Sequence, residues 1–212
     1  LNFRHEYCMI GDFIAEFDPR YVSAYTATCT EEIEDDACRV LGLPKTCTLW
    51  QYYRRDNLHL TSRFLESDYD IVRDIESANG KAIVYFSTIR RLEEFTPWLE
   101  EKLGIPIGIY HGKLPVDVKT HLQDAFKDGE IEVMCATNAF GLGVNIEDVR
   151  MVIHHDPPGT PEALSQEVGR AGRDEKDADC ITYYHTKGWQ TQEGFVEGNN
   201  PDATVVRAVY DT

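Results

Sequence analysis

The segment from Lys81 to Tyr184 alternates between short apolar runs and longer stretches with helical spacing, and this alternation limits the possible folds more than any other feature. Five runs rich in apolar, β-branched or aromatic residues are predicted strands: KAIVYFST, IPIGIYHG, IEVMCAT, VRMVIHHD and ADCITYYH. Three stretches are predicted helices: IRRLEEFTPWLEEKLG, VDVKTHLQDAFKDG and PEALSQEVGRAG. In the first two, the final glycine marks the predicted helix end. Because strand and helix alternate, we predict an α/β fold with a parallel sheet and helices on both faces.

The size and composition of the chain are those of a folded protein. It has 212 residues, 42% of them hydrophobic, which suits one large or two small domains. No apolar run reaches the ~18 residues that span a bilayer, and the first residues lack a signal-peptide pattern. We therefore expect a cytoplasmic protein with no membrane partner.

Charge and cysteine content restrict the kind of site. The formal net charge of −16 is unusual for a protein that binds nucleic acid, so any such site must be a local groove. The six cysteines, at positions 8, 29, 38, 47, 135 and 180, form no CxxC pair and no Cys/His cluster with zinc spacing. We expect buried free thiols and no metal site.

Polar and glycine-rich stretches follow four of the predicted strands: FSTIR, YHGKL, ATNAFGLGVN and HHDPPG. In parallel sheets, ligands bind beyond the carboxyl ends of the strands. Glycines in NAFGLGVN would let the backbone approach a ligand, and Asn145 could bond a sugar or phosphate. Turn glycines would look the same in isolation, but four such stretches at strand ends favour a binding site.

Two arginines three residues apart stand in QEVGRAGRDE, each preceded by a glycine. On a helix, Arg170 and Arg173 would lie on one face, and two guanidinium forks suit phosphate oxygens. The alternative is a solvated helix end in which they pair with nearby carboxylates. The candidate partners are Glu167, Asp174 and Glu175.

These motifs resemble those of a known enzyme family. CATNAFGLGVNIEDVRMVIHHDPP followed by QEVGRAGRD is similar to motifs V and VI of superfamily 2 helicases, and in detail to the RecQ family of DNA helicases. AIVYFSTIR and IYHGKL resemble the motif IV region. Upstream, TAT resembles motif III, RRDNLHL the segment that joins two RecA-like domains, and LNFRHEY the end of an aromatic-rich loop. The resemblance spans roughly Leu1 to Lys187.

The resemblance implies a RecA-like domain of an ATP-dependent DNA helicase, preceded by part of a first RecA-like domain. The chain has neither GxxxxGK[ST] nor DExH, so ATP and Mg²⁺ would be bound mainly by an absent first domain, and this chain alone should hydrolyse no ATP. The expected divisions are 1–60 for the first-domain remnant and joining segment, 61–188 for the second RecA-like domain, and 189–212 for a tail or accessory domain. Within 1–60, we expect a strand over YVSAYTAT and a capped helix over TEEIEDDACRVLGL that ends near Gly42. Nucleoid or nuclear localisation would follow in a bacterium or a eukaryote.

The resemblance also assigns roles to residues. Arg173 would be the arginine finger that reaches the γ-phosphate, and Arg170 a second phosphate or cleft contact. Gly143, Asn145 and Gln166 would take part in cofactor binding, with Gln166 also linking the site to DNA. The residues expected along the track for single-stranded or forked DNA are Phe3, Arg4, Ser87, Thr88, Arg90, His111, Gly112, Thr137 and Asn138.

Some positions depart from the family pattern. Ile89 stands where an arginine is usual, HGKL replaces HAGL, and Lys119 stands where arginine is common. No cysteine follows Cys180, so the tail lacks the usual four-cysteine zinc module; DATVVRAVYDT could be a short helix, a docking helix or a frayed end. Two alternatives stay open: a DEAD/DEAH-type RNA helicase, and a non-catalytic interaction module with the same fold.

Overall fold

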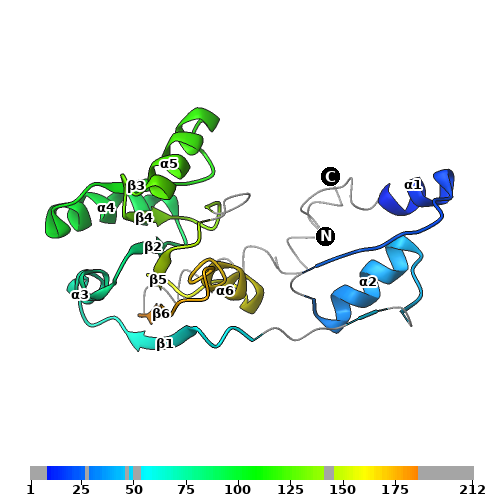
Figure 1. Cartoon of the computed structure of the whole chain (residues 1–212), viewed down its shortest axis with the longest axis horizontal. Coiled ribbons are helices and arrows are strands. Elements are labelled where there is room, and N and C mark those ends of the chain that lie inside the picture. The colour runs from blue at the N-terminus through cyan, green and yellow to red at the C-terminus, as the bar shows by residue number, and fades with distance from the viewer. Residues whose placement is uncertain (1–8, 27–28, 46–47, 50–53, 141–145, 186–212) are drawn as a thin grey trace, which may run out of the picture. The chain divides into compact units, whose positions relative to one another are not determined.

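The structure is a computed structural model that describes residues 9–26, 29–45, 48–49, 54–140 and 146–185. The chain divides into two compact units, Leu1–Arg54 and Arg55–Thr212 (Figure 1). The second unit starts at Arg55 rather than at residue 61, where the sequence placed the boundary. Among the described residues, no helix has both the length and the apolar character needed to cross a membrane.

The second unit is built on a six-stranded sheet in which every pair of neighbouring strands is parallel. Its order is β1-β6-β5-β2-β4-β3 (Figure 1). The strands are β1 (Leu58–Phe64), β2 (Lys81–Tyr85), β3 (Ile107–Tyr110), β4 (Val133–Ala136), β5 (Val149–His154) and β6 (Ala178–Tyr184). All residues of β2 and β4 are buried, as expected for inner strands of a parallel sheet, which are covered on both faces.

Helices cover both faces of this sheet, as the alternation predicted. They are α3 (Tyr69–Ser77), α4 (Ile89–Leu103), α5 (Val116–Asp128) and α6 (Pro161–Val168). Alternate residues of β2 belong to different cores: Ala82 and Val84 pack with residues of α3 and α4, whereas Ile83 and Tyr85 pack with residues of α5 and α6. The sheet therefore separates two hydrophobic layers.

The predicted helix ends of α4 and α5 are confirmed. Gly104 and Gly129 follow the two helices with φ of 65° and 83°, the left-handed conformation that glycine adopts without a steric penalty. At its start, α4 is capped by Thr88, whose Oγ1 accepts a hydrogen bond from the Arg91 N–H at 3.2 Å.

Two elements of the second unit were missed. β1 was not predicted, and only its first residues, Leu58–Leu60, were assigned to a joining segment. It is an edge strand that is mostly exposed, so burial did not select a continuous apolar run there. α3 was not predicted, although Ile71, Val72 and Ile75 form its buried side.

In the first unit, the described helices are α1 (Ile10–Phe17) and α2 (Glu31–Leu41). α2 was predicted with its caps: Thr30 accepts from the Ile33 N–H at 3.3 Å, and Gly42 has a φ of 66°. The prediction of a strand over YVSAYTAT is wrong for its described part, because residues 21–26 have no regular secondary structure. Tyr21 and Tyr25 are 79% and 92% exposed, and the described part of this unit has no strand for them to pair with.

Candidate functional site

The two arginines of the sequence motif lie in a turn that follows α6. The helix begins at the Thr160 cap, whose Oγ1 accepts from the Ala163 N–H at 3.1 Å, and it ends at Val168. The expectation that Arg170 and Arg173 share a helix face is therefore wrong, since both come after the last helical residue. Gly172 takes a φ of 53°, which bends the chain away from the helix axis.

The turn is fastened to the start of the neighbouring strand. The Gly172 N–H donates to the Val149 carbonyl at 2.8 Å, and Val149 is the first residue of β5. Ala171 is fully buried between the arginines. The backbone of the turn thus lies at the amino ends of β5 and β6. The polar stretches that follow the strands lie at the opposite, carboxyl ends.

The side chain of Arg173 is exposed, and that of Arg170 is half-buried. Partial burial, together with the charges of Arg170 and Arg55, lowers the pKa of the Arg173 guanidinium. Arginine stays protonated throughout the physiological range, so this shift reports three positive charges that lie near one another. Guanidinium forks that lie this near one another suit the several oxygens of a phosphate.

Two of the carboxylates that are near these arginines in the sequence contact other residues. Asp174 pairs with Arg150, and with Lys176 at 3.7 Å. Glu167 is buried, and its Oε2 lies 3.0 Å from Nε2 of His154 in β5. Of the three acids considered from sequence, two are therefore engaged with residues outside the arginine pair.

Arg170 also lies close to the phenol of Tyr85 at the end of β2. Burial raises the pKa of Tyr85, and the charge of Arg170 opposes that rise. The Tyr85 ring stacks on His154 with centroids 5.6 Å apart. The half-buried Arg170 thus lies against a buried polar group formed by Tyr85, His154 and Glu167.

A second set of candidate residues comes together at the carboxyl ends of three adjacent strands. Tyr85 pairs in register with Ala136, and so does Tyr110, so the residues just after β2, β3 and β4 are neighbours. The predicted DNA-track residues that follow these strands are Ser87, Thr88, Arg90, His111, Gly112, Thr137 and Asn138. The structure therefore brings together the motif IV and motif V regions.

Individual members of this set differ in what they offer a ligand. Asn138 is exposed, whereas His111 and Thr137 are 8% exposed each. Thr88 is occupied as the cap of α4, and Arg90 pairs with Glu94 at 2.8 Å. Thr88 therefore caps a helix, and Arg90 forms an ion pair on the surface of α4. The sequence alone did not predict either contact.

Part of the predicted site lies outside the described residues: Phe3, Arg4, Gly143 and Asn145. Gln166 is described, and it is exposed on α6 four residues before Arg170.

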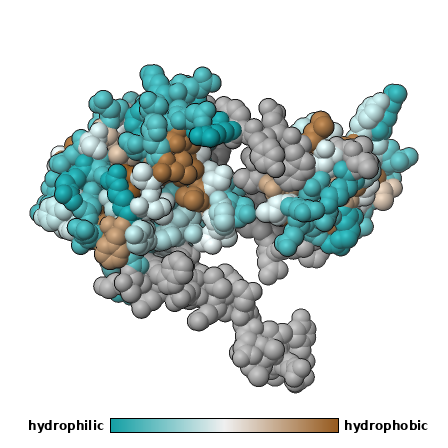
Figure 2. Space-filling view, turned by 90° about the horizontal axis from the view of Figure 1, so that it is seen from below, coloured by the Kyte–Doolittle hydropathy of each residue, from teal (hydrophilic) through white to brown (hydrophobic). Residues whose placement is uncertain are grey.

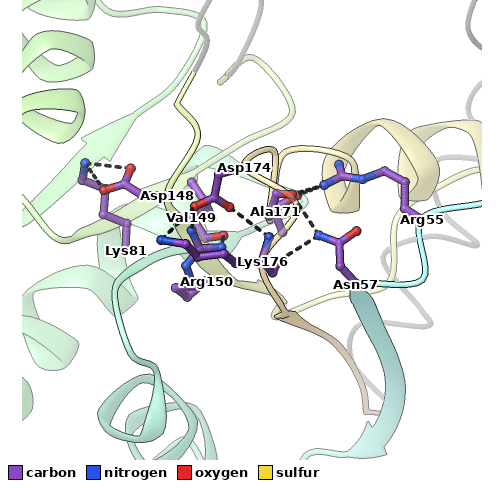
Figure 3. Close-up of polar contacts among 10 residues, drawn as sticks. Arg55, Asn57, Lys81, Asp148, Val149, Arg150, Ala171, Asp174 and Lys176 are labelled. Atoms are coloured by element: carbon purple, nitrogen blue, oxygen red, sulfur yellow. Dashed lines mark hydrogen bonds and ion pairs between the residues drawn. The ribbon is translucent and has the colours of Figure 1, made fainter.

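Sequence reasoning missed two residues that contact the arginine turn, Arg55 and Asn57. Both donate side-chain hydrogen bonds to backbone carbonyls of the turn (Figure 3). They belong to RRDNLHL, which was singled out only as a joining segment. Their signal was weak, because polar residues between domains are usually solvated.

Sequence reasoning also missed a cluster of potential metal ligands. His155, Asp156 and His185 offer ligand atoms within 4.8 Å of one another. However, Nη2 of Arg91 lies 3.3 Å from Nε2 of His155. A guanidinium beside this nitrogen would oppose a metal cation there. Asp156 also lies 3.2 Å from Nδ1 of His155 and 3.0 Å from Nε2 of His185, so the cluster is better described as a polar group that joins the ends of β5 and β6.

Comparison with known proteins agrees with this geometry. Residues 67–175 match the helicase conserved C-terminal domain family. The ATP-dependent DNA helicase Q1 of Pongo abelii is 36% identical over 190 residues, which cover 86% of this chain and 29% of that protein. The ATP-dependent DNA helicase RecQ of Bacillus subtilis (strain 168) is 32% identical over 199 residues, which cover 92% of this chain and 34% of that protein. The chain thus spans about a third of the length of these relatives.

A solved structure with the same fold is S. cerevisiae Dbp5 bound to RNA and ADP BeF3. It matches with a TM-score of 0.67 and 21% sequence identity, over 89% of this chain and 52% of that one. This likeness concerns the fold, and it confirms the predicted RecA-like sheet. Together, the motifs, the fold and the family match show that the chain belongs to the RecQ family of superfamily 2 helicases and carries a helicase C-terminal domain.

Proposed function

We propose that this chain supplies the arginine finger and half of the DNA track of an ATP-dependent RecQ-type DNA helicase. The observation that carries the proposal is the exposed side chain of Arg173, which stands at a tight turn with the half-buried Arg170 near it. Two guanidinium forks in one turn suit phosphate oxygens.

In this proposal, ATP and Mg²⁺ are held mainly by a P-loop domain of the full-length protein. Arg173 would approach the γ-phosphate and stabilise the charge that develops during its transfer to water. Arg170 would make a second phosphate contact from its half-buried position against Tyr85. Closure of the two domains around ATP and their opening after hydrolysis would move the protein along DNA.

The DNA track would run over the carboxyl ends of β2, β3 and β4. Ser87, Asn138 and the backbone amides of the adjoining loops could bond phosphate oxygens without reading the bases. The face of the molecule in Figure 2 is largely hydrophilic, and its hydrophobic side chains form only small patches. With a net charge of −16, the contacts must be local and sensitive to salt.

The arginine-finger assignment predicts a large effect of Arg173→Ala on catalysis with little effect on stability. In the full-length protein, DNA-stimulated ATP turnover should fall by about 10³-fold or more, as for other arginine fingers. The melting temperature should change little, since exposed substitutions usually alter stability by about 0.5 kcal/mol or less. Steady-state ATPase assays with single-stranded DNA and thermal unfolding would measure the two quantities.

A matched control is Arg73→Ala, which removes another exposed arginine, paired with Asp70 on α3. It should leave turnover unchanged. Normal turnover by Arg173→Ala would contradict the finger assignment, whereas no ATP turnover by the full-length wild-type protein would support the non-catalytic module. Stimulation by RNA but not by DNA, in the wild-type protein, would favour the RNA helicase alternative.

A further inference from the structure

We propose that Arg55, assisted by Asn57, is a positioning residue that fixes the arginine turn and so sets where Arg173 can reach. This inference rests on the proposed function, because it concerns the same phosphate contact. It adds a residue outside the helicase motifs recognised in the sequence, more than a hundred positions upstream of the turn and at the start of the second unit.

Arg55 binds the end of α6 through its planar guanidinium. Nη1 donates to the Gly169 carbonyl at 3.1 Å. Nη2 donates to the Ala171 carbonyl at 2.8 Å (Figure 3) and also to the Gly172 carbonyl. The carbonyls at a helix end have no partner within the helix. A cation placed there satisfies them and also interacts favourably with the helix dipole.

Asn57 holds the other side of the same turn. Its Nδ2 donates to the Gly172 carbonyl at 2.9 Å and to the Lys176 carbonyl at 2.8 Å (Figure 3). The backbone carbonyl of Asn57 accepts a hydrogen bond from the Ala178 N–H at 2.9 Å. The segment 55–57, just before β1, therefore forms hydrogen bonds to the backbone on both sides of Arg173.

The opposite side of the turn is held by β5. The Gly172 N–H bonds the Val149 carbonyl, and Arg150 pairs with Asp174 (Figure 3). Residues 172 and 174 are thus both fixed, while the Arg173 side chain between them is exposed. This arrangement suits a finger whose backbone is set before it meets a phosphate.

The terminal nitrogens of Arg55 point at carbonyls, which indicates a geometric role rather than a direct phosphate contact. Placement matters for such a role, since a shift of about 1 Å at a catalytic group can cost roughly 100-fold in rate. Loss of Arg55 should therefore lower turnover through Arg173. It should change the binding of ATP in the ground state much less.

The test is a double-mutant cycle on the full-length protein, with Arg55→Ala, Arg173→Ala and the combined variant. We expect Arg55→Ala to lower the kcat of DNA-stimulated ATPase by about 10- to 100-fold, with a KM for ATP within about twofold of wild type because finger contacts act in the transition state. In the Arg173→Ala background, the same change should cause almost no further loss. Arg55→Lys keeps the charge, but a single ammonium cannot reproduce the fork, so it should recover little of the lost kcat.

The results separate this inference from the proposed function. If Arg173→Ala itself leaves kcat unchanged, the proposed function fails and this inference fails with it. If Arg173→Ala lowers kcat but Arg55→Ala causes an equal loss with and without Arg173, Arg55 supports the fold in general and only this inference is overturned. Full recovery by Arg55→Lys would also overturn it, since charge would then suffice.

Asn57→Ala gives a second measure, and it decides the matter if Arg55→Ala does not fold. It removes two hydrogen bonds to the turn and leaves Arg55 in place. A kcat loss that disappears in the Arg173→Ala background supports positioning. A loss that persists there contradicts it.

Discussion

Asp156 shows how one buried carboxylate links stability to pH. Burial acts to raise its pKa, but His155, His185 and the Ser87 backbone N–H outweigh that effect and lower the pKa below its ordinary value. A depressed pKa stabilises the fold above the unfolded-state pKa of about 3.9, and this contribution is lost as pH falls through the folded-state pKa. We predict that Asp156→Asn destabilises the protein by about 1–3 kcal/mol at pH 7. The difference from wild type should shrink below about pH 4.

Urea unfolding at a series of pH values would measure this difference. Asp124→Asn, at an exposed position on α5, is the matched control and should show neither effect. A difference that stays constant down to pH 3 would contradict the role of the Asp156 charge.

At the scale of the element, glycines with the same backbone conformation should differ in their tolerance of a side chain. Gly104 and Gly172 have φ of 65° and 53°, but a Cβ at Gly104 would meet nothing within 4 Å. At Gly172 it would lie 2.5 Å from Nδ2 of Asn57 and 2.6 Å from the Lys176 carbonyl oxygen. Gly104→Ala should cost about 1 kcal/mol from backbone strain alone. Gly172→Ala should cost about 1–3 kcal/mol more, because the turn must also move.

Thermal or urea unfolding of the two variants, measured side by side, would give these values. Equal destabilisation would mean that the contacts of Asn57 and Lys176 with Gly172 adjust at little cost in free energy. The arginine turn would then not hold Arg173 in a fixed position.

At the scale of the whole molecule, this chain should hydrolyse no ATP by itself. It has no GxxxxGK[ST] to cradle phosphates and no DExH to hold Mg²⁺, so the arginines have no bound nucleotide to act on. We expect turnover indistinguishable from a blank at saturating ATP and single-stranded DNA. A coupled ATPase assay on the 212-residue chain would measure it. DNA-stimulated turnover that is lost in Arg173→Ala would contradict this expectation.

The sequence by itself determined the kind of fold and the family. Alternating apolar runs and helical stretches between Lys81 and Tyr184 predicted the parallel sheet, because burial on both faces requires continuous apolar strands. Glycines at 104 and 129 marked helix ends, since a left-handed residue costs glycine little. The motifs around Arg170 and Arg173 identified the helicase family, because their spacing is specific.

Only the tertiary structure decided how the arginine turn is held. Local pattern did not show β1, because the apolar residues of this mostly exposed edge strand form no continuous run. The local sequence pattern also could not show that α6 ends at Val168 or that Asp174 forms an ion pair with Arg150, because both features depend on contacts with β5. Nor could it pair Arg55 with the carbonyls of Gly169 and Ala171, more than a hundred residues away. The parallel pairing of β1 with β6 brings Arg55 close to the arginine turn. Residues so far apart in the chain come into contact only through the tertiary fold.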